Sequence, residues 1–463
     1  MDSQIDIQEE RMNKFVEHTE KILNQYPEIR HWEVFGGTQL GQDFQIEKSY
    51  MKQSNLHQTN IITMRIFGVN GKTGSVSLNK FSKDFVRTGV ENAVHIMKAS
   101  IENTEFKKLA KPSTTYPAIK TPWDPEIASL TADDALEIID DFLQQKDRDE
   151  RITSVSGGLS YSDSRIRLLN SNGIDQSERA TDCQAGIEFV MAETIKGKKE
   201  DTRGYDYQGY NFFSDLSKDI QNIFNNAYSI AVKGLHKTKI ETKNYPVILD
   251  PSAVSLLISS PICSGVNAES VYQKRSFLQD AVGKKIAPDV LTIIDNPLLE
   301  GGLESTSFDA EGIRTQTKEI VKDGVLKTLL HNTYTANLFG TTSTGNATRG
   351  WGSPSIGIST FNIDVKPGET SKDEMIEDIS EGIYIKASYD RPNIVTGEFS
   401  GLIAVGFLIE DGELTTSLRE SMIGTSLLEL YGKIVKISRE QVRKTRRYLP
   451  YVLLEDLKIS GSK

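Results

Sequence analysis

Four short turn sequences constrain the fold of this chain more than any other feature. Asn70-Gly71, Asn172-Gly173, Asp323-Gly324 and Asp411-Gly412 each interrupt stretches with a strand-like pattern. A tight two-residue hairpin turn needs positive φ at both central positions, which Gly adopts freely and Asn or Asp tolerates. We therefore predict a β-hairpin at each dipeptide, and antiparallel strands through most of the chain.

Helical patterns alternate with these hairpins. Apolar spacing and N-cap residues predict helices over 8–25, 83–98, 131–143, 213–235, 251–265 and 372–379, with strands at 30–35 and 61–69. Four prolines close together predict a linker over 111–127. We expect an α+β fold in which N-terminal (1–110) and central (128–240) helix-plus-hairpin domains precede a large β-rich C-terminal domain (241–463).

Charge and composition exclude several classes of protein. The 463 residues include 64 acidic and 54 basic ones, a net charge of −10, whereas proteins that neutralise nucleic-acid phosphates are usually basic. The polar N-terminus lacks the apolar core of a signal peptide, and no apolar run reaches bilayer length. With only two cysteines as well, we expect a cytoplasmic protein with no nucleic-acid partner and no membrane partner.

Two stretches are candidate binding segments. Residues 337–352, NLFGTTSTGNATRGWG, cannot form a regular helix or a central strand, so they either present backbone groups to a ligand or form a surface loop. Residues 433–447, KIVKISREQVRKTRR, carry seven basic residues and one acid. This basic run either binds a phosphate or an acidic partner, or it forms a solvated face.

The helical segment SLLISSPICSGVNAES, residues 255–270, raises the question of catalysis. It contains Cys263, no histidine, and no acid before Glu269. No two of the six histidines in the chain lie within six residues of each other, so a local zinc pair is absent. Distant ligands that converge in space remain an alternative, and a catalytic Cys263 would need a nearby histidine.

Several longer stretches resemble the TldD/PmbA family of intracellular zinc-dependent peptidases and their partner subunits. Residues 323–350 resemble the family's hairpin and its Ser/Pro-Thr-Gly-Asn loop, and residues 291–312 resemble its "ivDdp...gg...fDdEG" run. Residues 366–385 and 395–414 are similar to its Pro-Gly helix and its Val-Thr-Gly strands. SVYQKRSFLQDAVGKKI, residues 270–286, is most similar to the PmbA branch, also called TldE.

The resemblance implies what is missing from residues 255–270. In the TldD branch the matching helix carries His-Glu-x-x-x-His, whose histidines bind zinc and whose glutamate is the general base; a cysteine near the C-terminus is a third ligand. The two histidine positions fall near Ile258 and Cys263 here, and the glutamate position falls near Ser259. No cysteine follows Cys263, so catalytic residues, metal ligands and a cofactor are not expected in this chain.

The implied role is a non-catalytic PmbA/TldE-like subunit, with zinc in a TldD-type partner and unfolded peptides as substrates. Thr344, Gly345 and Asn346 are the candidates for lining the peptide cavity; the alternative for this loop is turn formation at a dimer contact. Two other readings remain open: a zinc-free homodimeric binding or regulatory protein, and a self-sufficient peptidase.

Overall fold

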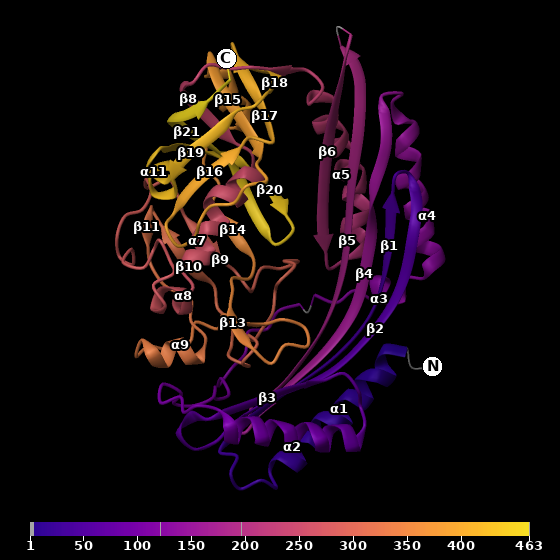
Figure 1. The fold of residues 1–463 in the computed structure, drawn as a ribbon, viewed down its shortest axis with the longest axis vertical. Helices are drawn as coiled ribbons and strands as arrows, with labels where there is room; N and C mark the ends of the chain where they lie inside the picture. The colour runs from indigo at the N-terminus through magenta and orange to yellow at the C-terminus, as the bar shows by residue number, and fades with distance from the viewer. Residues whose placement is uncertain (1–3, 121, 196, 463) are drawn as a thin grey trace.

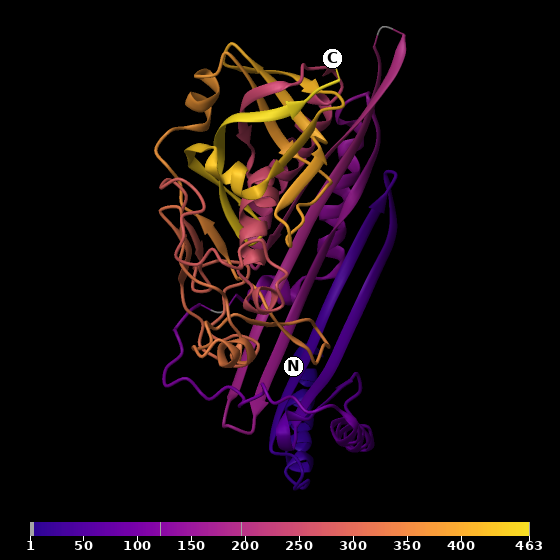
Figure 2. The ribbon, with the colours of Figure 1, turned by 60° about the vertical axis from the view of Figure 1, so that its left-hand side comes forward.

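A computed structural model of the chain describes residues 4–120, 122–195 and 197–462. Its architecture is α+β, as predicted, and two large sheets dominate it. A six-stranded antiparallel sheet extends along the whole molecule, and the β-rich C-terminal part lies against it (Figure 1). The turned view shows the long strands of this sheet crossing behind the C-terminal part (Figure 2).

The six-stranded sheet consists of two consecutive units, each with three antiparallel strands that helices precede and follow. The N-terminal unit contains α1 (Gln4–Leu23), β1 (His31–Glu47), β2 (Tyr50–Phe67), η1 (Val69–Gly71), β3 (Thr73–Leu78) and α2 (Lys83–Ala99). The central unit contains α3 (Pro125–Ser129), α4 (Ala132–Gln144), η2 (Gln145–Arg148), β4 (Ile152–Asn170), β5 (Asp175–Ile195), β6 (Lys198–Tyr210) and α5 (Phe213–Lys233). The strand order is β3-β2-β1-β4-β5-β6, so the two units share one sheet and join through β1 and β4.

The helices cover one face of this sheet. Val34 and Met64 pack beneath α1 and α2, and Phe44 and Ile187 pack beneath α4 and α5. The opposite face holds Phe35, whose ring meets Trp351 of the C-terminal part edge to face at 6.4 Å between centroids. The six-stranded sheet is therefore the middle layer between its helices and the C-terminal part.

The C-terminal part is built on a 13-stranded sheet. Its path is β11-β10-β9-β14-β21-β8-β15-β17-β18-β7, and β19 and β20 branch from β21, with β16 beside β19. The strands are β7 (Lys237–Thr238), β8 (Lys243–Leu249), β9 (Ile293–Asp295), β10 (Lys318–Lys322), β11 (Val325–Leu326), β14 (Ile363–Val365), β15 (Glu381–Ala387), β16 (Glu398–Leu402), β17 (Val405–Glu410), β18 (Glu413–Leu418), β19 (Met422–Ser426), β20 (Ile434–Lys444) and β21 (Arg447–Ser460). A separate pair is formed by β12 (Ala347–Arg349) and β13 (Ile356–Ile358).

Short helices complete the C-terminal part. They are α6 (Pro251–Val254), the π-helical turn η3 (Ser255–Ser259), α7 (Ser260–Gly265), α8 (Ala268–Tyr272), α9 (Thr333–Leu338), α10 (Lys372–Glu377) and α11 (Leu427–Gly432). Leu257, Ile258 and Ile262 place the helix formed by α6, η3 and α7 in the main core. No helix among the described residues is both long enough and apolar enough to cross a bilayer.

All four hairpins predicted from the turn sequences are present. They connect β2 to β3, β4 to β5, β10 to β11, and β17 to β18. Asp323 and Gly324 have φ of 48° and 72°, and Asp411 and Gly412 have 48° and 82°. These angles are the ones that the Asp-Gly sequence favours, so local chemistry determines the turns.

A buried ion-pair cluster joins the sheet to the C-terminal part. Glu33 of β1 is bound by Arg65 of β2, with 2.9 Å between Oε2 and Nη2, and it also pairs with Arg349 of β12. Burial alone would raise the pKa of Glu33, but the two guanidinium groups outweigh it and lower that pKa. Glu33 therefore stays charged, and the cluster fixes the position of the β12–β13 pair on the sheet.

Candidate functional site

The predicted helix over 251–265 is present and contains a π-helical turn. The Asp250 carboxylate accepts a hydrogen bond from the Ser252 backbone N–H at 2.8 Å, and Pro251 fills the first turn. The helix then widens at Ser255–Ser259 and ends at Gly265. π-turns of this kind are frequent at functional sites because they change which side chains share a face.

The three positions aligned with the zinc motif do not share one environment. Ile258 and Ser259 are fully buried, and the Ser259 hydroxyl has no hydrogen-bond partner among the described residues. Cys263 is half-buried and lines a cavity. The helix presents Ser260 and Ser264 to the same cavity.

This cavity, which we call the arginine pocket, has a volume of about 400 Å³. It is lined by Ser260, Cys263, Ser264, Asn267, Ser270, Arg275, Ile358, Ser359, Thr360, Ile394, Val395, Arg446 and Arg447. Arg446 and Arg447 belong to the basic run 433–447. For this run the sequence allowed two alternatives, a binding role and a solvated face. The structure places these two residues in the arginine pocket, opposite the helix.

Contacts with the six-stranded sheet hold the two arginines in place. The β20–β21 turn lies against the edge strand β6, where Lys444 Nζ is 2.8 Å from Asp206 Oδ1. Thr445 at the turn has φ of 52°, so the chain reverses directly before the arginines. Arg446 Nη1 then donates to the Thr360 carbonyl oxygen at 2.8 Å. The β6 edge thereby positions one wall of the pocket.

The electrostatics of the pocket are dominated by buried groups. Burial raises the pKa of the Cys263 thiol to about 11, and nearby Arg447 only partly offsets this. Burial also lowers the pKa of Arg447, whose Nε is buried and has no hydrogen-bond partner among the described residues. Cys263 is thus a protonated thiol at neutral pH, and a thiol in that state is a poor nucleophile.

The donor set of the pocket does not fit zinc. Proteins bind zinc through thiolate, imidazole and carboxylate groups. The arginine pocket offers one thiol with a raised pKa, serine and threonine hydroxyls, an amide, and guanidinium groups that carry only donors and a positive charge. We therefore derive no metal-dependent step from these residues.

The loop residues proposed to line a peptide cavity have internal partners. Asn346 is fully buried, and its amide donates to Asp295 Oδ2 at 2.8 Å and to the Ser359 carbonyl oxygen at 2.9 Å. The hydroxyl of Thr344 donates to the His331 carbonyl oxygen at 3.1 Å. Gly345 has φ of 68°, as a tight turn requires. Asn346 is fully buried, and its amide stabilises the segment of the pocket wall at Ser359.

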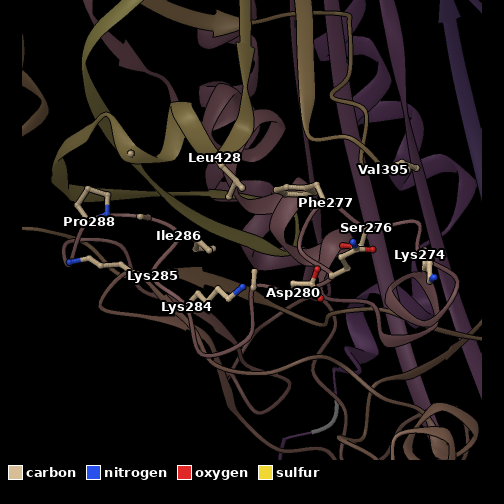
Figure 3. A pocket seen from close by; sticks show the side chains of 14 residues that line it. Lys274, Ser276, Phe277, Asp280, Lys284, Lys285, Ile286, Pro288, Val395 and Leu428 are labelled. Atoms are coloured by element: carbon tan, nitrogen blue, oxygen red, sulfur yellow. The ribbon is translucent and has the colours of Figure 1, made fainter.

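Two further cavities adjoin the arginine pocket. One of about 560 Å³ shares Ser260, Ser264, Ile394 and Arg447 with it. The other, of about 940 Å³, shares Val395, and Figure 3 shows Phe277, Ile286 and Leu428 among its labelled lining residues. The arginine pocket is therefore the middle of three connected depressions along residues 252–288 and 386–395.

Comparison with known proteins gives a consistent family assignment. Residues 242–461 match the PmbA/TldA metallopeptidase C-terminal domain, and residues 125–235 match the central domain. Together these matches cover well over half of the chain. The chain belongs to the PmbA/TldD family.

Individual relatives agree with this assignment. Metalloprotease PmbA of Escherichia coli O157:H7 is 30% identical over 338 residues, 72% of this chain and 71% of that protein. The metalloprotease PmbA homolog of Buchnera aphidicola subsp. Acyrthosiphon pisum is 29% identical over 399 residues, 84% of each chain. The solved structure of TldE from Thermococcus kodakarensis superimposes with a TM-score of 0.84 at 21% identity, covering 97% of this chain and 100% of that one, and shares its fold.

Most residues of the arginine pocket were not predicted from the sequence. Ser260, Ser264 and Arg275 line it, yet none of them was a candidate. One available signal was the i, i+4 spacing of Ser260 and Ser264, which puts two hydroxyls on one face of the helix. The other signal was the pair of adjacent arginines at the end of the basic run.

Proposed function

We propose that this chain is a non-catalytic, PmbA/TldE-like subunit of a cytoplasmic metallopeptidase complex. In this role it helps to bind unfolded peptides, and a zinc-bearing TldD-type partner cleaves them. The family assignment supports the metallopeptidase setting, and the shared fold with a TldE structure supports the branch. The two free cysteines, Cys183 and Cys263, are compatible with a reducing compartment.

The observation that carries the proposal is the donor set opposite the helix. Where the resemblance puts histidine, glutamate and histidine, this chain has two core residues and one protonated thiol. Arg446 and Arg447 line the same pocket as that thiol and are close enough to lower its pKa in part. A guanidinium pair disfavours a bound cation, so we assign the hydrolytic step to another subunit.

Strand edges near the pocket support peptide binding. Extended peptides bind to many proteins by adding a strand to an exposed sheet edge. Among the described residues, β13 pairs with β12 alone, and it leads directly into Ser359 and Thr360 of the pocket wall. A peptide held along such an edge is bound mainly through its backbone, which gives little sequence preference.

Native mass spectrometry of the complex isolated from its own cells tests the proposal. We expect the mass of this chain plus one different subunit, with one zinc ion that is lost on chelation. A metal-free homodimer would contradict the proposal and favour a binding or regulatory protein. Peptide cleavage by the isolated chain that survives chelators would favour a self-sufficient peptidase.

A further inference from the structure

We propose that the arginine pocket is an oxyanion site that binds a carboxylate group of a peptide ligand. This inference deepens the proposed function and rests on it for the identity of the ligand. The site itself follows from the pocket: three arginines, Arg275, Arg446 and Arg447, line a cavity of about 400 Å³ in a chain with a net charge of −10. Cavities of this size hold small ligands or single residues of a peptide.

The described lining of the pocket contains positively charged groups and no negatively charged one. No Asp or Glu is among those residues, and Ser260 and Ser264 add hydroxyl groups. Guanidinium groups bind carboxylates through paired, charge-assisted hydrogen bonds, and hydroxyls provide further donors. The combination is one that stabilises an oxyanion.

Arg447 gives the most direct indication of ligand binding in this pocket. Its Nε is buried and has no acceptor among the described residues, although a buried guanidinium N–H normally has one. Arg446, by contrast, uses Nη1 for the Thr360 carbonyl oxygen and is fixed in place. The terminal nitrogens of Arg447 also have no hydrogen-bond or ion-pair partner among the described residues, and a carboxylate in the pocket that Arg447 lines would accept from them.

The adjoining cavities indicate that the carboxylate belongs to a longer molecule. The cavity that shares Ser260, Ser264 and Arg447 is also lined by apolar groups of Leu256, Pro261 and Pro392. A ligand with its carboxylate on Arg447 can place an apolar side chain there. Two parts of a peptide carry this chemistry, the C-terminal carboxylate and the side chain of Asp or Glu.

Fluorescence anisotropy with the full chain distinguishes these sources. The probes are Gly-Ala-Ala-Leu-Ala with an uncharged BODIPY dye on the N-terminus and a free C-terminus, the same peptide as its C-terminal amide, and an amide in which Asp replaces Leu. We expect the free acid to bind about 10-fold more tightly than the plain amide, as for loss of one charged hydrogen-bonded group. Restored binding of the Asp-containing amide would identify a side-chain carboxylate as the ligand. Equal binding of all three probes, or no binding of any of them, would overturn the proposal.

Substitutions test the pocket directly. Arg447→Gln should weaken binding of the free acid about 10-fold, and the exposed Arg439→Gln on β20, outside the pocket, should leave it unchanged. Ser264→Asp should place a carboxylate beside the arginines, so it should abolish binding and raise Tm relative to the isosteric Ser264→Asn. A Ser264→Asp variant that melts at or below Ser264→Asn, or Arg447→Gln without effect on binding, would refute the site.

The two proposals fail in different ways. If the complex is a heterodimer that binds acid and amide peptides equally, the oxyanion site is contradicted and the proposed subunit role stands. If it is a metal-free homodimer that binds only carboxylate-bearing peptides, the subunit role is contradicted and the oxyanion site stands.

Discussion

The side-chain amide of Asn346 donates a hydrogen bond to the buried carboxylate of Asp295, with 2.8 Å between Nδ2 and Oδ2. Asp295 also accepts from the Phe361 backbone N–H at 2.7 Å and lies 3.3 Å from Lys318 Nζ. Asp295 comes from the run 291–312 and Asn346 from the run 323–350, two of the stretches that resemble the family. In this chain, the contact between them supports the wall of the arginine pocket.

Asn346→Ala should lower the free energy of unfolding by about 2–3 kcal/mol, because it leaves a buried carboxylate without one of its donors. Urea unfolding followed by circular dichroism measures this change. Thr342→Ala, an exposed position in the same loop, is the matched control and should change stability by less than about 0.5 kcal/mol. Equal losses in the two variants would show that Asn346 has no special structural role.

Gly204→Ala should destabilise the central unit by roughly 2–3 kcal/mol, because a Cβ there would lie 2.0 Å from the Ala227 carbonyl oxygen of α5. Gly209→Ala on the same strand is the control, since its Cβ would meet its nearest neighbour, Gln184 Cγ, at 3.4 Å. Thermal unfolding of the two variants should therefore give clearly different Tm values. If both variants have the same Tm, α5 does not pack as closely on β6 as described.

Glu178→Gln should reduce the loss of stability that accompanies a rise in pH. Burial raises the pKa of Glu178 to about 7, although Thr306 Oγ1 donates to its carboxylate at 2.7 Å. A carboxyl group with a raised pKa favours the folded state when it is protonated, so its contribution is lost between pH 4.5 and pH 7. The loss is at most ~3.5 kcal/mol, at about 1.4 kcal/mol for each pH unit between 4.5 and 7.

Unfolding midpoints at pH 5 and pH 8 measure this effect for the wild-type and variant chains. The difference between the unfolding midpoints at the two pH values should be smaller in Glu178→Gln than in the wild-type chain. Identical differences in both chains would mean that Glu178 ionises normally in the folded state.

Cys263 should react with iodoacetamide roughly 100-fold more slowly at pH 8 than a free thiol, because its raised pKa leaves little thiolate. Mass spectrometry of the labelled peptide measures the rate over a range of pH, and the rate should keep rising toward pH 11. Chain unfolded in urea provides the control, in which the ordinary thiol pKa returns. An inflection near pH 8.5 in the folded chain would mean that burial does not raise the pKa of Cys263, and an inflection below pH 7.5 would indicate an activated thiol.

Local chemistry explains which parts of the fold could be predicted. The four turn dipeptides form the expected hairpins, and Thr131 caps α4 in a capping box with Asp134. Strand length could not be predicted in the same way. The strands expected at 30–35 and 61–69 belong to β1 and β2, of 17 and 18 residues. Their polar outer halves carry no clear alternation because much of β2 is exposed on both sides.

The turn between β1 and β2 also could not be predicted from the sequence. It lies at Lys48 and Ser49, which have φ of 51° and 68°, and neither residue type is a signature of such a turn.

The arginine pocket could not be predicted for a different reason. Cys263 and Arg447 are 184 positions apart and meet only because the β20–β21 turn docks on β6. A long-range contact of this kind leaves no periodic pattern in either segment.

The joining of β1 to β4 in the six-stranded sheet has a consequence for folding order. Every other neighbouring pair in that sheet is a hairpin of consecutive strands, whereas Glu33 of β1 pairs with Asn170 of β4 across more than a hundred residues of chain. Local hairpins close quickly, and distant strands pair slowly because a long loop must be ordered first. We expect the two three-stranded units to form early and their union to limit the rate, so the open β1 and β4 edges are exposed to aggregation until that step is complete.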